Sequence, residues 1–134
     1  MAEVRLSRLH LIDTSMWACA LRRSGDEAER QRVLSPMRSG RAAWCQAVRL
    51  ELWRGVGSDE DRAILRRIES DVTMLAIDTQ TWNFACNLAD VGRKEGLQFP
   101  SQDLLIFACA RQHDAELVTR DTHFQQLAAL WQKL

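Results

Sequence analysis

Residues 9–23 read LHLIDTSMWACALRR, an apolar run that stops at an aspartate and then continues at helical spacing. The run over residues 9–12 has the length of a short buried strand. Residues 15–23 follow the three-to-four-residue period of a helix. The stretch therefore predicts a strand that ends at Asp13 and passes almost at once into a helix.

The rest of the chain repeats this alternation. Three further apolar runs predict strands, at residues 42–45, 73–77 and 116–118. The segments around them predict helices, at residues 27–38, 47–53, 58–70, 79–95 and 101–113, with a last one after Asp121. Because strands alternate with helices and hairpin signals are nearly absent, we expect an α/β sandwich: a short parallel sheet of four or five strands with helices on both faces.

Turn and capping residues support the predicted helix ends. Gly55 and Gly96 each follow a helix, as glycine commonly does at a helix C-terminus. Ser58 and Ser101 are expected to be N-caps, and Pro36 should kink or end the helix that contains it. Because no stretch resembles a linker, we expect a single domain over residues 1–134, a length that suits one core.

Two of the predicted helices carry the clearest core positions. The helix over residues 79–95 has a near-continuous apolar stripe, made of Trp82, Ala85, Cys86, Leu88, Ala89 and Gly92. The middle of the helix over residues 101–113 is apolar all round, which is typical of a central, buried helix.

Composition narrows the class of protein. The four cysteines show no CxxC spacing and only three histidines accompany them, so a zinc site lacks ligand pairs. We expect four buried thiols in a reducing cytoplasm. No apolar run approaches the roughly 18 residues of a membrane span, so we expect no membrane contact. The net charge is zero, but only two of the basic residues, Lys94 and Lys133, are lysines, and arginine favours bidentate contacts to phosphate.

Four acidic residues fall at one predicted edge of the sheet. In right-handed strand–helix–strand units the strands all end at the same edge, where ligands usually bind. Asp13 ends the first strand and Asp121 follows the last. Asp103 lies in the first turn of the buried helix, and Glu51 lies one turn into the helix after the second strand. We therefore expect the four carboxylates to converge.

Each acid also has an ordinary structural explanation. Asp13 fits a helix cap, and Asp103 complements a helix dipole, a contribution of about 0.3 to 1 kcal/mol. Asp121 fits a turn, and Glu51 could face an arginine across the core. Together these explanations are weaker, because carboxylates at one edge repel by about 1 to 4 kcal/mol per close pair. A cation would offset that repulsion.

The chemistry of the four acids indicates a hard divalent cation. Oxygen ligands alone suit Mg²⁺ or Mn²⁺, whereas zinc favours thiolates or paired histidines. Such ions activate water and neutralise charge in the hydrolysis of a phosphodiester. The acids therefore favour a metal-dependent nuclease.

Four segments of the chain follow the order and spacing of a known family. They read LIDTSMW at residues 11–17, VRLEL at 48–52, QDLLIFACA at 102–110 and LVTRDTHF at 117–124. One segment alone is weakly specific, but the four together cover nearly the whole chain. The chain thus resembles the PIN-domain family, and within it the VapC-type toxins, which implies a PIN-like α/β/α sandwich.

The resemblance implies an Mg²⁺- or Mn²⁺-dependent endoribonuclease that is the toxin of a type II toxin–antitoxin pair. Such proteins are typically homodimers, inhibited by a cognate antitoxin whose tail occupies the active-site groove. The catalytic and metal-binding residues that the resemblance implies are Asp13, Glu51, Asp103 and Asp121, with Thr119 and Ser15 in support. His123 departs from the pattern, because relatives often have another acid there, and this leaves the number of metal ions open.

Two further groups are candidates for partner contacts. The arginines that could guide the RNA backbone are Arg22, Arg23, Arg49, Arg54 and Arg120. Among the tryptophans, we expect Trp17 and Trp53 to be partly exposed at a homodimer or antitoxin interface, since tryptophan is enriched in interface hot spots.

Two other functions compete with a ribonuclease. The first is a PIN-like module that binds RNA or a protein without cutting it, although retention of all four acids argues against it. The second is a phosphatase or phosphotransfer domain with Asp13 as nucleophile. It is disfavoured because Ser15, not a second aspartate, lies two positions on. The RNA target cannot be read from the sequence, because RNA loops are recognised by shape and stacking.

Overall fold

A computed structural model describes residues 8–21 and 26–134. Its four strands form one sheet in the order β3-β2-β1-β4, and every neighbouring pair is parallel. The elements are β1 (His10–Ile12), α2 (Thr14–Leu21), α3 (Glu27–Arg38), β2 (Ala42–Trp44), α4 (Gln46–Arg54), α5 (Asp59–Asp71), β3 (Thr73–Met74), α6 (Thr79–Lys94), α7 (Ser101–Gln112), β4 (Glu116–Val118) and α8 (His123–Trp131). The predicted α/β fold with a short parallel sheet is confirmed.

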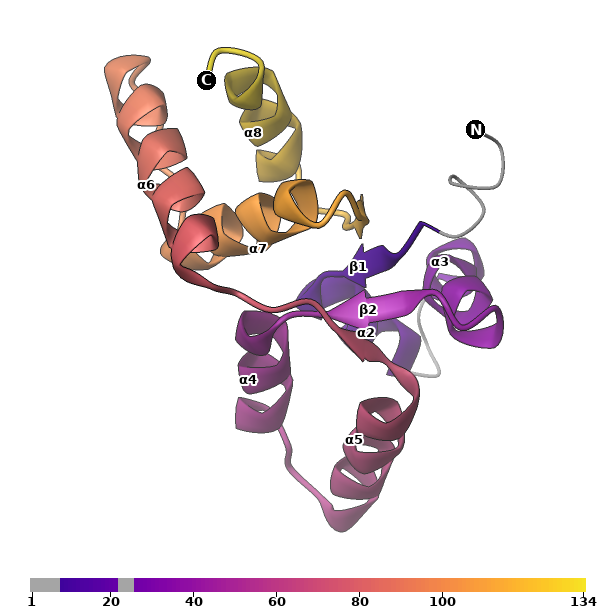
Figure 1. The fold of residues 1–134 in the computed structure, drawn as a ribbon. Coiled ribbons are helices and arrows are strands. Elements are labelled where there is room, and N and C mark those ends of the chain that lie inside the picture. The colour runs from indigo at the N-terminus through magenta and orange to yellow at the C-terminus, as the bar shows by residue number, and fades with distance from the viewer. Residues whose placement is uncertain (1–7, 22–25) are drawn as a thin grey trace.

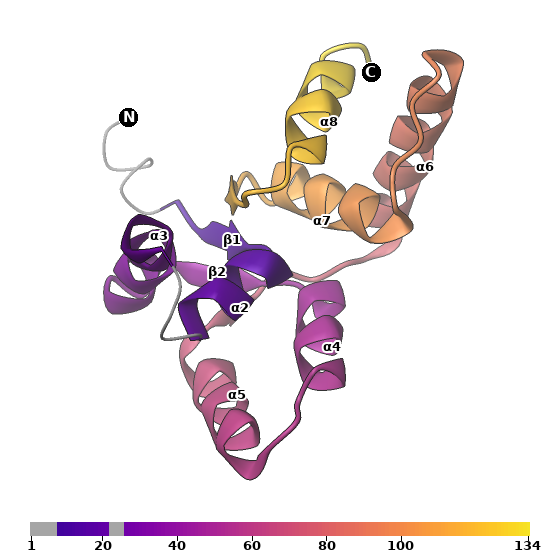
Figure 2. The ribbon, with the colours of Figure 1, turned by 180° about the vertical axis from the view of Figure 1, so that it is seen from behind.

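The helices cover both faces of the sheet. Figures 1 and 2 show α6, α7 and α8 on one side and α2, α4 and α5 on the other, with α3 beside α2. This arrangement follows from the strand order. The chain moves from β1 through β2 to the edge strand β3 and must then cross the sheet to place β4 on the other side of β1.

The sheet is small because its strands are short. The strand predicted over residues 73–77 is paired only at Thr73 and Met74, and Leu75 adds one more bond, from its N–H to the Trp44 carbonyl oxygen at 2.8 Å. Beyond it, the N–H of Ile77 is satisfied by the side chain of Gln46 at 2.8 Å. A side chain therefore replaces the neighbouring strand as hydrogen-bond partner, and the sheet ends there.

Helix α7 forms the centre of the core, as predicted. Every residue from Leu104 to Ala110 is buried, and the helix packs against β4, α4, α6 and α8. Because neighbours surround this helix, an apolar surface on all sides is stabilising rather than aggregation-prone.

The inner face of α6 differs from the predicted stripe. The buried positions are Thr81, Ala85, Leu88 and Gly92, whereas Trp82 is 54% exposed and Cys86 is also exposed. Ala89 is exposed as well, so the predictions that Trp82, Cys86 and Ala89 face inward are wrong. The buried face of α6 instead includes Thr81, whose hydroxyl bonds to Asp78 at the start of the helix and to Gln112 of α7, so that this polar group is satisfied inside.

Trp17 also departs from its prediction. It is 2% exposed and packs edge-on against Trp44, with 6.4 Å between ring centroids. A partly exposed interface role for Trp17 is therefore wrong, because α2 turns this face toward the core. Trp53 is half-buried, and its indole N–H donates to Glu69 at 2.8 Å.

The helix ends follow the predicted signals with one exception. Ser58 caps α5 by accepting from the Asp61 N–H at 3.1 Å, and Gly96 follows α6 with a positive φ of 75°. The cap predicted at Ser101 is wrong, because Pro100 takes the N-cap position and Ser101 is the first helical residue. Helix α3 ends two residues after Pro36.

In the described part of the chain, no helix has the length and hydropathy of a membrane span.

Candidate metal and active site

The carboxyl ends of β1 and β4 lie side by side. Ile12 pairs with Val118 in the register of these parallel strands, and the Asp13 N–H donates to the Val118 carbonyl oxygen at 3.0 Å. The two residues that follow the strands, Asp13 and Thr119, are therefore brought together from distant parts of the chain.

Asp13 is the most buried of the four acids, at 8% exposure. Its carboxylate accepts hydrogen bonds from the Thr14 N–H at 2.7 Å, the Ser15 hydroxyl at 3.1 Å and the Thr119 hydroxyl at 3.0 Å. Burial nevertheless raises the pKa of Asp13, because lost solvation outweighs these bonds, and the Asp121 charge raises it further. Ser15 and Thr119 thus hold a carboxylate whose charge the site solvates poorly.

Thr119 also positions Asp121. Its hydroxyl oxygen, whose proton is donated to Asp13, accepts from the Asp121 N–H at 3.0 Å. The Asp121 carboxylate in turn accepts from the His123 N–H at 2.9 Å. One threonine hydroxyl therefore links two of the acids.

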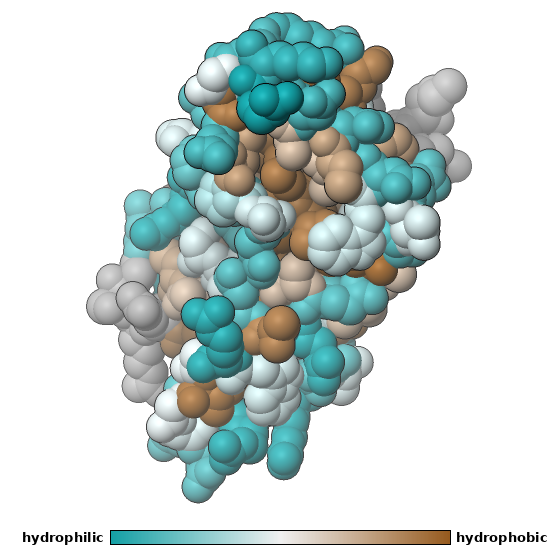
Figure 3. Space-filling model, turned by 90° about the vertical axis from the view of Figure 1, so that its left-hand side faces the viewer, coloured by the Kyte–Doolittle hydropathy of each residue, from teal (hydrophilic) through white to brown (hydrophobic). Residues whose placement is uncertain are grey.

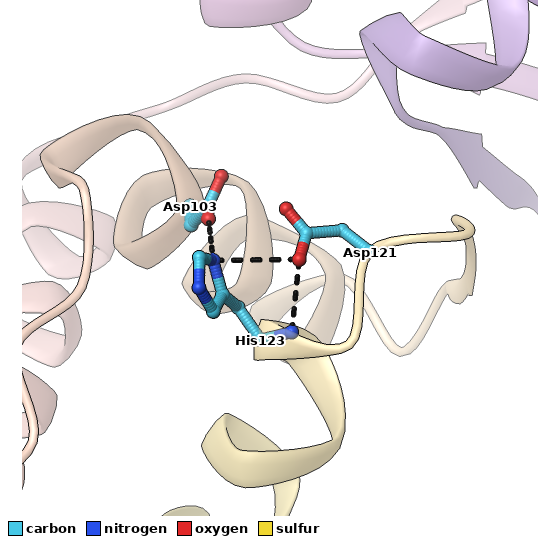
Figure 4. Close-up of side chains that lie close together, drawn as sticks. All are labelled: Asp103, Asp121 and His123. Atoms are coloured by element: carbon cyan, nitrogen blue, oxygen red, sulfur yellow. Dashed lines mark hydrogen bonds and ion pairs between the residues drawn. The ribbon is translucent and has the colours of Figure 1, made fainter.

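Asp103 reaches the same place from the first turn of α7. Its Oδ2 lies 3.1 Å from His123 Nδ1, which also lies 3.3 Å from Asp121 Oδ1 (Figure 4). Burial raises the pKa of Asp103, the hydrogen bond from His123 opposes the shift, and the charges of Asp121 and Asp13 add to it. The imidazole thus joins two carboxylates that would otherwise repel each other.

Glu51 approaches from α4. The first turns of α4 and α7 are tied together because the Gln102 side chain donates to the Ala47 carbonyl oxygen at 2.9 Å. Glu51 is half-buried. Within the described residues its side chain makes no hydrogen bond or ion pair, so the alternative of an arginine partner across the core is wrong for this part of the chain.

All four acids line one open cavity of about 510 Å³, together with Thr14, Ser15 and Arg120. The structure therefore brings the predicted acids together. One oxygen each from Asp103 and Asp121 and a ring nitrogen of His123 lie within 4.8 Å of one another. Carboxylate oxygens are the ligands that hard divalent cations prefer, so the chemistry of this donor set fits Mg²⁺ or Mn²⁺.

The acids also perform the local roles that were considered as alternatives. The Asp13 carboxylate accepts from the N–H of Thr14, the first residue of α2, at 2.7 Å. Asp103 lies in the first turn of α7, and Asp121 satisfies an N–H group at the start of α8. Capping and convergence therefore coexist, because helices that begin at the edge of the sheet direct their first turns toward it.

Three of the predicted RNA-binding arginines lie in the described part of the chain, and one of them borders the acidic cavity. Arg120 lines the acidic cavity and pairs with Glu29 at 3.0 Å. Arg49 pairs with Glu69 of α5 at 2.6 Å, and Arg54 is exposed at the end of α4. Arg22 and Arg23 lie outside the described residues.

His123 is the site residue that sequence reasoning left out of the predicted set. A single histidine after an aspartate carries little signal, and the available hint was its place where relatives often have an acid. Its contact with Asp103 joins α8 to α7, and such a long-range contact cannot be read from local pattern.

Comparison with known proteins identifies the family. The PIN domain family model matches residues 10–130. The chain is 32% identical to VapC ribonuclease Mb1587 of Mycobacterium bovis and to ribonuclease VapC11 of Mycobacterium tuberculosis, each over 90% of this chain and 92% of the relative. The fold matches the crystal structure of VapBC2 from Rickettsia felis bound to a promoter DNA fragment, with a TM-score of 0.72, 15% identity, and coverage of 88% of this chain and 92% of that one. The chain therefore belongs to the PIN-domain family, in its VapC branch.

Proposed function

We propose that the chain is a metal-dependent endoribonuclease that hydrolyses RNA phosphodiester bonds, the toxin of a type II toxin–antitoxin pair. The observation that carries the proposal is the convergence of Asp13, Glu51, Asp103 and Asp121 on one open cavity, in a chain whose relatives are named VapC ribonucleases. The oxygen donors suit Mg²⁺ or Mn²⁺. The absence of disulfides, with all four cysteines free, suits the cytoplasm as the place of action.

The chain's own residues hold the carboxylates ready for the ion. A bound divalent cation lowers the pKa of its water and neutralises charge on the phosphodiester. Thr119 and Ser15 fix the Asp13 carboxylate. Helix α7 carries Asp103, and the segment between β4 and α8 carries Asp121. Burial raises the pKa of Asp13 and of Asp103. A nearby cation would therefore stabilise their charged forms more than water does here.

Arg120 is the arginine best placed to contact the RNA backbone. It lines the acidic cavity, and its side chain is 54% exposed although it pairs with Glu29. Guanidinium groups bind phosphate oxygens in a bidentate manner. Arg49 and Arg54, on α4, do not line this cavity, and they stay weaker candidates together with Arg22 and Arg23.

A groove beside the acids suits the antitoxin. A second cavity, of about 380 Å³, shares Thr14 and Glu51 with the acidic one and is otherwise bordered mainly by α2, α4 and α5, with apolar side chains such as Leu52, Ile64 and Leu65. A segment of the antitoxin with an apolar face would fill this second cavity, and a basic residue next to that face would enter the acidic one. The positive charge of that residue would substitute electrostatically for the metal ion.

Homodimer formation is the second partner proposal. It is supported by large apolar side chains that stay exposed in the described chain, among them Leu50 on α4, Met74 on β3 and Trp82 on α6. The face that α6 and α4 border in Figure 1 shows apolar side chains gathered in its upper half and bordered by hydrophilic ones (Figure 3). Light scattering at several concentrations tests this proposal, and a monomer at every concentration would contradict it.

The decisive experiment measures RNA cleavage by the purified chain. We expect cleavage with Mg²⁺ or Mn²⁺, none in excess EDTA, and none by Asp13→Asn. Asp59→Asn is the matched control, because Asp59 is 99% exposed on α5, away from the cavity. Full activity in EDTA would contradict the proposal. RNA binding without cleavage under all metal conditions would instead favour the non-catalytic module, and covalent phosphorylation of Asp13 the phosphotransfer alternative.

A further inference from the structure

We propose that His123 is a direct ligand of the divalent ion and that its nitrogen shifts the preference of the site from Mg²⁺ toward Mn²⁺. The inference rests on the proposed function, since it concerns the ion of that site. The observation behind it is that His123 Nδ1 lies between the carboxylates of Asp103 and Asp121 (Figure 4).

The distances around His123 Nδ1 match those between neighbouring ligands of one ion. This nitrogen lies 3.1 Å from Asp103 Oδ2 and 3.3 Å from Asp121 Oδ1. Ligands at about 2.1 Å from an octahedral ion lie about 3.0 Å apart when they occupy adjacent positions. The nitrogen therefore has, to each of the two carboxylate oxygens, the spacing of adjacent positions in a coordination octahedron.

Contacts on either side hold the imidazole in this orientation. The His123 N–H donates to Asp121 Oδ1 at 2.9 Å, which fixes the backbone next to the carboxylate. The ring of Phe99 packs edge-on against the imidazole, with 6.1 Å between centroids and 82° between planes. The ring is therefore oriented before any ion binds, which lowers the entropic cost of recruiting it as a ligand.

A nitrogen ligand changes which ion the site prefers. Mg²⁺ demands oxygen ligands and retains its waters, whereas first-row transition ions accept imidazole readily. A site with Asp103, Asp121 and His123 should thus favour Mn²⁺ over Mg²⁺ more than an all-carboxylate site does. Co²⁺, which lies further along the affinity order, should bind more tightly than Mn²⁺.

The contacts of His123 also suit a different role, in which the imidazole contacts RNA and only hydrogen-bonds to the carboxylates. The two roles differ in metal binding without RNA. The variant His123→Asp replaces nitrogen by oxygen, and His113→Asn is the matched control. The His113 imidazole bonds to the Ala76 carbonyl oxygen at 2.9 Å, at the other end of α7 from Asp103.

The experiment measures Mn²⁺ and Mg²⁺ dissociation constants by calorimetry, with no RNA present. We expect the ratio of the Mg²⁺ constant to the Mn²⁺ constant to fall by about tenfold or more in His123→Asp, the size of effect that ligand-shell changes usually have, and to stay unchanged in His113→Asn. Pulsed electron paramagnetic resonance of the Mn²⁺-loaded wild type should show nitrogen hyperfine coupling, a readout that needs no folded variant.

Each contrary outcome is separable. An unchanged ratio in folded His123→Asp, or wild-type Mn²⁺ without nitrogen coupling, would overturn the ligand role of His123 and leave the metal-dependent nuclease intact. Loss of RNA cleavage with unchanged metal binding would also overturn it, and would place His123 at the RNA. Wild-type protein that binds neither ion would overturn this inference together with the metal dependence of the proposed function.

Discussion

Neutralising Asp103 should stabilise the protein when no divalent metal is present. One oxygen of Asp103 lies within 4.8 Å of one of Asp121, and Asp13 adds a third negative charge. The substitution Asp103→Asn removes one member of this repelling group while keeping the shape of the side chain. A role in capping or in complementing the helix dipole predicts the opposite sign, because it makes the negative charge at the start of α7 favourable.

The magnitude follows from the separation of the charges. Two charges no more than 4.8 Å apart repel by at least about 1 kcal/mol at the dielectric constant of water and by at least about 3.5 kcal/mol at an effective value of 20. An asparagine still accepts the bond from His123, but without the charge it loses about 1 kcal/mol of that bond. The net gain of about 1 kcal/mol should raise the melting temperature by roughly 3 to 6 °C.

The assay is a melting curve of each protein in EDTA and again with several millimolar Mn²⁺, at fixed ionic strength. Asp59→Asn is the matched control, since Asp59 also lies in the first turn of a helix but is 99% exposed. This control should melt at the wild-type temperature or slightly below it. Mn²⁺ should stabilise the wild type more than Asp103→Asn, because the variant has lost a ligand.

The charge-repulsion reasoning fails if Asp103→Asn melts below the wild type in EDTA. It fails equally if Mn²⁺ raises both melting temperatures by the same amount. Either result would assign Asp103 the ordinary role of a helix N-terminal acid and would separate it from a shared metal site.

Three further predictions concern single contacts. Burial raises the pKa of Asp13, so between the ordinary and the raised pKa the folded metal-free protein binds more protons than the unfolded chain. The free energy of unfolding should therefore fall as the pH rises through that window. Urea unfolding in EDTA at several pH values should show this fall, and a smaller one for Asp13→Asn. Thr119→Val removes one of the three donors to the Asp13 carboxylate and leaves the Asp121 N–H without its acceptor, and should lower the free energy of unfolding by about 1 to 3 kcal/mol. Thr119→Ser should largely restore the stability, and equal loss in both variants would contradict the role of the hydroxyl. Trp44→Ala, in the core, should lower the free energy of unfolding by about 3 to 5 kcal/mol. Trp82→Ala, on the surface of α6, should change it by less than about 0.5 kcal/mol. Similar losses in the two variants would contradict the buried position of Trp44 and the exposed position of Trp82.

The order of strands and helices is predictable because it depends on local signals. Apolar runs followed by helical spacing mark β1 and β4 within a residue or two. The face of α6 is less predictable, because apolarity alone selects Trp82 and Cys86. Thr81 faces inward, where its hydroxyl bonds to Asp78 in the capping box of α6 and to Gln112 of α7. The bond to α7 is a contact between two helices, which the apolar pattern of α6 alone does not reveal.

The site shows the same division between topology and tertiary contact. A parallel sheet places the ends of β1 and β4 at one edge, and this rule is enough to gather Asp13 and Asp121. The Gln102 bond to the α4 backbone and the approach of His123 to Asp103 depend on side-chain conformations that no local pattern encodes. Sequence reasoning therefore reaches the acids but misses the histidine between them.

The energetics of the cluster connect stability to function. Asp13 is buried with a raised pKa although three hydrogen bonds hold it, and Glu51 has no ion-pair partner among the described residues. A fold selected for stability alone would neutralise or expose such groups, because unpaired buried charge is costly. If a divalent ion binds here as proposed, it should contribute to folding stability as well as to catalysis. Chelation should then lower the melting temperature of the wild type in the same titration that abolishes RNA cleavage.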